Sequence, residues 1–170
     1  RWISHNNEPG FGWKWPYYAE YLPQRNQFVV VNRSNNELAL LTRDGNRVKV
    51  FGSQVLNYPH EVAFDKAENL YVADMKNNQL AIFFNASNYE THEVIKFPES
   101  YGLPKTVAVD EEDNVILGFV ANGAAYFLLL MQRDKPVITE TSMLEPIIPL
   151  FNVKLDVSAG TSGATVIYQR

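Results

Sequence analysis

Few residues in this chain have the types and spacing that catalysis or metal binding requires. The three histidines, His5, His60 and His92, are too far apart to form the short-range clusters that hold zinc. The acidic run 110–113 lacks the alternate-residue spacing and the central glycine of a calcium loop, so a solvated turn is the favoured interpretation. We therefore predict no catalytic residue, no metal site and no cofactor.

One adjacent pair, His60 and Glu61, precedes an apolar strand at a place where a ring of such strands would gather ligands. Its equivalents in the neighbouring repeats described below are Lys105-Thr106 and Tyr18-Ala19. These counterparts differ chemically, and Glu61 is the one carboxylate among them. A solvated rim is therefore favoured over a ring of metal ligands.

A second group of residues suited to binding is aromatic and lies near the beginning of the chain. All three tryptophans fall within the first fifteen residues. Trp13 and Trp15 are two residues apart, so in an extended chain both rings would face one side. With Tyr18 they would form a stacking platform for a sugar, an aromatic metabolite, a proline-rich peptide or another subunit. The alternative is that the rings pack over the body of the protein.

The composition indicates one ordinary folded domain. The chain has 170 residues, of which 46% are hydrophobic and 13% aromatic, with a formal net charge of −4 and no cysteine. These values exclude intrinsic disorder, disulfides and thiol chemistry, and they disfavour nucleic-acid binding. The longest apolar run, 123–131, is far shorter than the roughly 20 residues of a spanning helix. A cysteine-free chain suits an oxidising compartment as well as the cytosol, and we lean toward a secreted or extracytoplasmic location.

An internal repeat organises the chain. The segment 58–74 matches 103–119 at a spacing of 45 residues, with Pro59 aligned on Pro104. A weaker copy lies 42 residues upstream of the first, with Leu22 aligned on Phe64. We predict approximate repeats at 16–57, 58–102, 103–144 and 145–170, and the last would be completed by an N-terminal strand at 2–4.

Each repeat has the pattern of a four-stranded antiparallel sheet. A short apolar strand such as Val62–Phe64 is followed by an Asp-led polar turn, a second strand at Leu70–Ala73, a turn at Asn77-Asn78 and two further strands. Four strands in 40 to 45 residues are typical of a β-propeller blade. A β-sandwich is the alternative, but it does not predict the repeated block. We therefore predict an all-β fold, a β-propeller of about four blades.

The residues of these blocks resemble the NHL repeat family of β-propellers. The resemblance is carried by Pro59, 62–65, 69–74, Asn78 and 80–83, and in part by Pro104, 107–110 and 114–116. Glu61 and Thr106 depart from the family's glycine, and Phe119 departs from its aspartate. The resemblance implies a propeller that serves as a binding platform, although a related six-bladed class includes hydrolases and lactonases.

Four repeats are fewer than such propellers usually have. Either the ring is a compact one of four blades, or it is a partial propeller completed by oligomerisation or by a longer chain, because an open ring leaves strand edges and an apolar blade face uncovered.

The expected function is a non-catalytic binding or assembly module. Its partner would be a protein, including a second copy of this chain, or else a small ligand. The alternative is a metal-dependent hydrolase or lactonase. The predicted binding residues are Trp13, Trp15, Tyr18, His60, Glu61, Asp74, Lys76 and Lys105.

Overall fold

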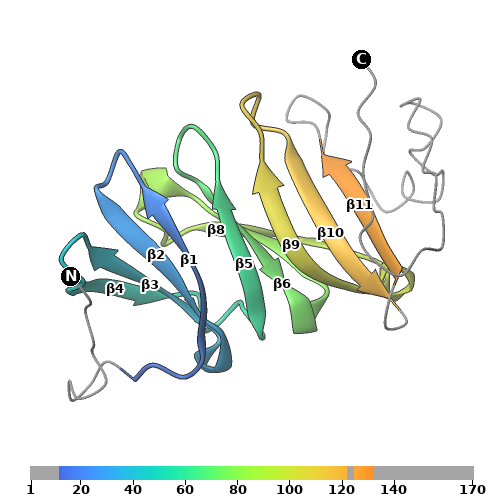
Figure 1. Ribbon diagram of the computed structural model, residues 1–170, viewed down its shortest axis with the longest axis horizontal. Coiled ribbons are helices and arrows are strands. Elements are labelled where there is room, and N and C mark those ends of the chain that lie inside the picture. The colour runs from blue at the N-terminus through green and yellow to red at the C-terminus, as the bar shows by residue number, and fades with distance from the viewer. Residues whose placement is uncertain (1–11, 122–124, 132–170) are drawn as a thin grey trace. The chain divides into compact units, whose positions relative to one another are not determined.

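The computed structural model describes residues 12–121 and 125–131, and this part of the chain is built of antiparallel β-sheets (Figure 1). All of these residues fall in a compact unit that ends at Gln132. The prediction of an all-β chain is confirmed. The predicted fourth repeat, 145–170, and the strand at 2–4 lie outside the described residues and stay predictions. Within the described part, no helix has the length and apolar character needed to span a bilayer.

The strands form three separate sheets. The first sheet consists of β1 (Pro16–Leu22), β2 (Gln27–Asn32), β3 (Glu37–Thr42) and β4 (Arg47–Phe51). The second consists of β5 (Pro59–Phe64), β6 (Leu70–Asp74), β7 (Gln79–Phe83) and β8 (His92–Lys96). The third consists of β9 (Leu103–Val109), β10 (Val115–Ala121) and β11 (Ala125–Met131). The short 3-10 turns are η1 (Arg33–Asn35), η2 (Met75–Asn77), η3 (Asn85–Ser87) and η4 (Glu99–Tyr101).

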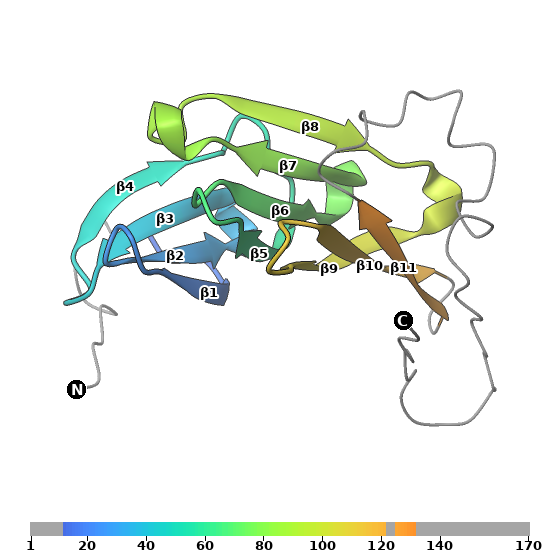
Figure 2. The same cartoon turned by 90° about the horizontal axis from the view of Figure 1, so that it is seen from above.

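In every sheet the strands follow one another in chain order, so the first strands are β1, β5 and β9. These first strands lie side by side, because β1 contacts β5 and β5 contacts β9. Figure 2 shows them along one side of the described unit, with β4 and β8 along the opposite side. The sheets therefore stack face to face, and their first strands converge.

Two apolar layers hold the sheets together. Val29 and Leu40 of the first sheet pack with Leu70 and Val72 of the second. On its other side, the second sheet packs through residues such as Leu80 against the third. All five residues of β7 are buried. Because neighbouring sheets cover both faces of β7, this strand carries apolar residues on both faces, whereas the outer strand β8 is mostly exposed.

Each first strand has a proline as its first or second residue, and a β-bulge follows that proline. The pairing register shifts after Pro16 in β1, after Pro59 in β5 and between Pro104 and Thr106 in β9. Proline lacks an N–H donor and is therefore best tolerated at the start of a strand or at a bulge. A bulge turns the side chain that follows it. The residues placed in this way are Tyr17, His60 and Lys105.

The registers correct one alignment made from the sequence. Pro16 pairs with Asn32, and Pro59 pairs with Asp74, so the counterparts of His60-Glu61 in β1 are Tyr17-Tyr18 and not Tyr18-Ala19. The reason is that six residues separate Tyr21 from its partner Phe28, whereas five separate the equivalent Phe64 from its partner Leu70. A single spacing of 42 therefore fits β2 but misses β1 by one residue.

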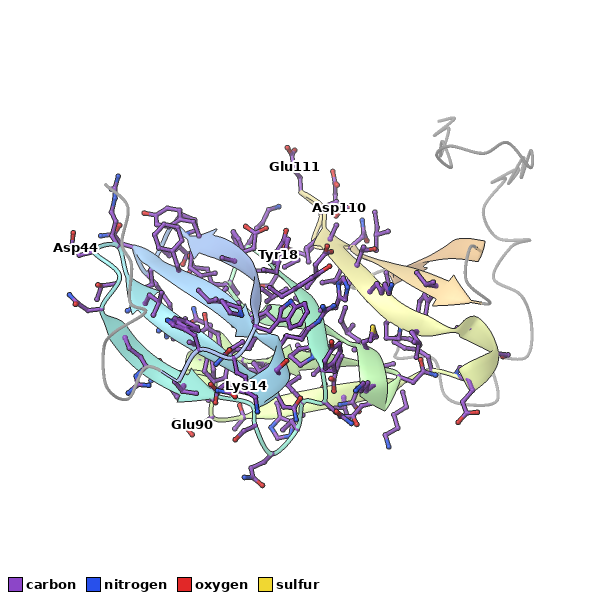
Figure 3. All side chains as sticks on the ribbon, turned by 60° about the horizontal axis from the view of Figure 1, so that its bottom comes forward. Lys14, Tyr18, Asp44, Glu90, Asp110 and Glu111 are labelled. Atoms are coloured by element: carbon purple, nitrogen blue, oxygen red, sulfur yellow. The ribbon has the colours of Figure 1, made fainter. Side chains whose placement is uncertain are left out.

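The Asp-led turns are held by their own side chains. The Asp65 carboxylate accepts hydrogen bonds from the backbone N–H of Ala67 at 2.9 Å and of Asn69 at 2.8 Å. Asp110 accepts from the N–H of Glu112 at 3.0 Å and of Asn114 at 2.7 Å. The hydrogen bond from the Asn114 side chain is the main cause that lowers the pKa of Asp110. This turn projects outward (Figure 3).

Candidate functional site

The side chains of the first strands and of the turns beside them form two groups of opposite charge. The first, which we call the cationic–aromatic cluster, contains Tyr17, Arg33, Tyr58, His60, Lys76 and Lys105. The second, the acidic pair, consists of Glu20 and Glu61 and lies beside Tyr18. The cluster draws on all three sheets, and the pair draws on the first two.

Arg33 is the most buried cation of the cluster. It opens η1 and is 7% exposed. Its guanidinium carbon lies 3.6 Å from the centre of the Tyr17 ring and 4.6 Å from that of Tyr58. Its Nε has no hydrogen-bond partner among the described residues. Two π faces therefore offset the charge where a buried guanidinium would ordinarily have a carboxylate.

Tyr58 connects this arginine to a second cation. The Lys76 Nζ lies 4.3 Å from the centre of the Tyr58 ring. Tyr58 has a positive φ of 59°, which is rare for a bulky residue. Its N–H donates to the Asn36 Oδ1 at 2.8 Å, and this bond fixes the turn. The Tyr58 ring therefore lies within 4.6 Å of both cations.

His60 lies against the same group from β5. It is 7% exposed, and its ring meets Tyr17 edge-on with 4.4 Å between centres. Burial, followed by the positive charges of Arg33 and Lys105, lowers the pKa of His60 to about 4. A hydrogen bond with the Lys105 backbone acts in the opposite direction. His60 is consequently neutral at pH 7, and its Nδ1 has no partner within the described part.

The acidic pair lies further along the strands. The Glu61 carboxylate accepts a hydrogen bond from the Val107 N–H at 3.3 Å. Burial raises the pKa of Glu61, and the charge of Glu20 adds to this effect. The Tyr18 hydroxyl donates to the Glu20 Oε1 at 2.8 Å, which is the main cause that raises the pKa of Tyr18 to about 12. Among residues 12–121 and 125–131, no group of three histidine or acidic side chains is placed to hold a metal ion.

Asp74 does not share a surface with the other predicted residues. It is 0% exposed, and its carboxylate accepts from the Asn57 N–H at 2.7 Å, from Asn77 at 2.8 Å and from Gln79 at 2.7 Å. These bonds fix η2 and the loop that leads into β5. The expectation that Asp74 contacts a ligand is thus replaced by a structural role, because no surface of its side chain is available.

The first sheet contains a hydrogen-bond network like that of Asp74 and Gln79, with the carboxylate and the amide exchanged between the two positions. Asn32 occupies the position of Asp74, and Glu37 that of Gln79. Asn32 accepts from the Lys14 N–H at 2.8 Å and donates to the Glu37 Oε1 at 2.6 Å. Each network therefore combines one carboxylate and one amide, in opposite order. In the third sheet the buried Phe119 occupies this position.

The two tryptophans do not form the one-sided platform that an extended chain would give. Trp15 has a φ of 61°, and the chain bends at Lys14, so the alternation of a strand does not apply. Trp13 is half-buried, whereas Trp15 is 64% exposed. The Trp15 carbonyl accepts from the Arg33 N–H at 3.2 Å, which joins this segment to the cluster.

Trp15 and Tyr58 occupy equivalent places, since each precedes the proline of a first strand and each has a positive φ. Tyr17, Arg33 and Tyr58 are not among the binding residues predicted from the sequence. The aromatic-proline pairs 15–16 and 58–59 are the signal that would have found the aromatic members.

Comparison with solved structures identifies the architecture. Two structures of virginiamycin B lyase from Staphylococcus aureus resemble the chain, each over 71% of this chain and 42% of the other. The selenomethionine-substituted form is 14% identical with a TM-score of 0.52, and the catalytically inactive form with quinupristin is 16% identical with a TM-score of 0.50. This chain thus spans less than half of the length of those proteins. At such identity the likeness concerns the fold alone.

The stacked meander sheets are therefore consecutive blades of a β-propeller, as predicted. Residues 56–83 match the NHL repeat, which includes the loop before β5 and the strands β5 to β7. The resemblance to the NHL repeat seen in the sequence is therefore confirmed over this segment, and the likeness to solved structures shows the propeller fold. No curated protein sequence matches it.

Proposed function

We propose that this chain is a non-catalytic binding or assembly module that holds its partner, a protein or a small ligand, against the cationic–aromatic cluster. The observation that carries this proposal is the convergence of Tyr17, Arg33 and Tyr58, which come from three separate segments, with the Arg33 guanidinium carbon 3.6 and 4.6 Å from the centres of the two rings. Aromatic and arginine side chains grouped in this way are the residue types that dominate recognition surfaces.

The chemistry of the cluster supports binding over catalysis. A histidine with a pKa of about 4 is a poor general base at neutral pH and is not protonated to act as an acid. The exposed rings of Trp15 and Tyr17, at 64% and 42%, offer apolar contact area instead. Tyr18 and Glu61 follow Tyr17 and His60 on the same strands, and the half-buried Trp13 comes two residues before Trp15.

The alternative is a metal-dependent propeller enzyme. Two features favour keeping it in the test: the fold neighbours are named as a lyase, and the acidic pair brings two carboxylates together. In this alternative Glu61 would be a metal ligand. We would measure the melting temperature in Mg²⁺ and Ca²⁺, with Glu61→Gln as the matched variant. A metal-dependent rise that disappears in Glu61→Gln would replace the binding module by the enzyme.

The binding module itself is tested with a panel of metabolites and short peptides, followed by thermal shift and hydrogen exchange. A true ligand should protect the first strands and should lose affinity in Tyr17→Ala. The matched control is Tyr21→Ala, because Tyr21 lies four residues further along β1 and is 37% exposed. Ligands whose binding depends on Tyr21 and not on Tyr17 would refute the proposed location.

A further inference from the structure

We infer that the cationic–aromatic cluster is a site for an oxyanion, namely a phosphate or sulfate group, formed by Arg33, Lys76 and Lys105. This inference rests on the proposed function, since it names the chemical class of ligand that the same surface would take.

The charge of the cluster is unbalanced. Arg33 comes from η1, Lys76 from η2 and Lys105 from β9, so consecutive blades each contribute one cation. Within residues 12–121 and 125–131, none of the three forms an ion pair with a carboxylate. The chain as a whole carries a net charge of −4. A local excess of positive charge in an acidic protein attracts anions to that place.

The separation of the cations is constrained by the tyrosine between them. Arg33 and Lys76 both lie over the Tyr58 ring, at 4.6 and 4.3 Å from its centre. Like charges held on one ring repel each other, and this repulsion is weakly screened where the arginine is buried. An anion placed beside the ring would relieve the repulsion, and an oxyanion has enough oxygens to meet more than one cation at once.

Two buried nitrogens in the cluster also lack hydrogen-bond partners among the residues that the structure describes. They are the Arg33 Nε and the His60 Nδ1, and both residues are 7% exposed. Tyr17 lies against both side chains, at 3.6 Å from the guanidinium carbon and 4.4 Å from the imidazole centre, and its own ring is 42% exposed. Buried polar atoms without partners are rare and costly. Rotation of this partly exposed ring would open the guanidinium to a bound anion.

The acidic pair sets the boundary of the site. Glu20 and Glu61 lie on the same first strands, and the charge of Glu20 acts on Glu61 and not on His60. The end of the first strands that bears the prolines carries the three cations, and the carboxylates of Asp74 and Glu37 at that end accept hydrogen bonds from the Gln79 and Asn32 side chains. An anionic ligand would be directed to the proline end by both groups.

The inference is tested by titrating the protein with sodium sulfate and sodium phosphate, with sodium chloride and sodium acetate at matched ionic strength. Calorimetry and the melting temperature report binding. We expect saturable stabilisation by sulfate or phosphate beyond that by chloride. Lys76→Gln and Lys105→Gln should each lower the affinity for sulfate or phosphate about three- to fivefold, and the double variant should lower it about tenfold or more.

Lys66→Gln is the matched control, because Lys66 is exposed in the turn at the other end of β5. The affinity of this variant for sulfate or phosphate should stay within about twofold of that of the unaltered protein. Equal effects of sulfate and chloride, equal binding of acetate, or an equal loss in Lys66→Gln would each overturn the oxyanion site. If a ligand sensitive to Tyr17→Ala is found while sulfate and phosphate fail, the binding module stands and this inference alone is refuted.

Discussion

Equivalent positions of the first and second blades differ in burial although their residues are alike. Phe28, Val30 and Leu41 in the first blade are half-buried. Their equivalents in the second blade are Leu70, Val72 and Phe83, which are 0%, 0% and 2% exposed. The difference is that the second blade packs this face on the first, whereas no described residues form a blade beyond the first.

The comparison shows that burial in a stacked repeat is set by the neighbour and not by the residue. The first blade keeps apolar side chains on its outward face, including Tyr21, Val48 and Val50, which are 37%, 50% and 37% exposed. A face of this kind has the composition of an interface between blades. Its contribution to stability in the described part should accordingly be smaller than that of the same positions one blade on.

The largest expected difference between the two blades is in the pH dependence of stability. It arises at the residue that follows the proline of the first strand, which is His60 in the second blade and Tyr17 in the first. Since the pKa of His60 is about 4 when folded, the unfolded chain takes up a proton first as the pH falls below about 6.5. The His60 contribution is fully present above that pH and is lost toward pH 4, by about 3 kcal/mol in total.

Urea unfolding of the protein and of His60→Leu at several pH values would measure this contribution as the difference between the two. His92→Gln is the control, because His92 is exposed on β8. An unchanged pH dependence in His60→Leu would contradict the assignment.

The burial comparison itself is tested with one substitution made at both positions. Val72→Ala should lower the free energy of unfolding by about 2–3 kcal/mol, because the side chain is completely buried and leaves a cavity. Val30→Ala should cost less than half of that, since its methyl groups are partly solvated already. Equal losses in urea unfolding would mean that the outward face of the first blade is covered in solution.

The hydrogen-bond networks of the two blades, in which carboxylate and amide are exchanged, predict a change of similar size in the free energy of unfolding. Asp74→Asn removes an acceptor oxygen from three buried donors and should cost about 1–3 kcal/mol. Adding Gln79→Glu recreates the Asn32–Glu37 order of the first blade and should restore at least half of the loss. A double variant no more stable than Asp74→Asn would show that the two networks are not interchangeable.

The smallest effect is expected at the surface contact between the blades. Lys49 of β4 pairs with Glu90, which is 72% exposed, and also donates to the Asn88 carbonyl at 2.7 Å. Glu90→Gln should change the unfolding free energy by less than about 0.5 kcal/mol, because exposed ion pairs are solvated and screened. A larger loss would indicate that this pair helps to fix the angle between blades.

The strands and turns were predictable because their signals are local. Asp65 and Asp110 begin turns that their own carboxylates hold, and the apolar runs between them are too short for anything but strands. The binding cluster was less accessible. Arg33 follows β2 in a polar stretch, and nothing near it in sequence announces a buried guanidinium between two tyrosines.

The misplaced β1 alignment has a similar cause. One extra residue between Tyr21 and its partner Phe28 leaves the strand pattern intact and moves only the first strand out of phase. Likewise, the positive φ of Trp15 depends on its contact with η1, which lies far along the chain. Local patterns predict elements, whereas the meeting of distant segments decides the site.

The paired carboxylate and amide have a consequence for how such a protein changes over generations. After a duplication, two copies of a repeat usually drift independently, one amino acid at a time. Here a lone replacement at Asn32, Glu37, Asp74 or Gln79 leaves either two acids facing each other or one acceptor too few. Each blade therefore has its own stable pairing of one carboxylate with one amide. A change from one pairing to the other by single substitutions passes through a less stable protein.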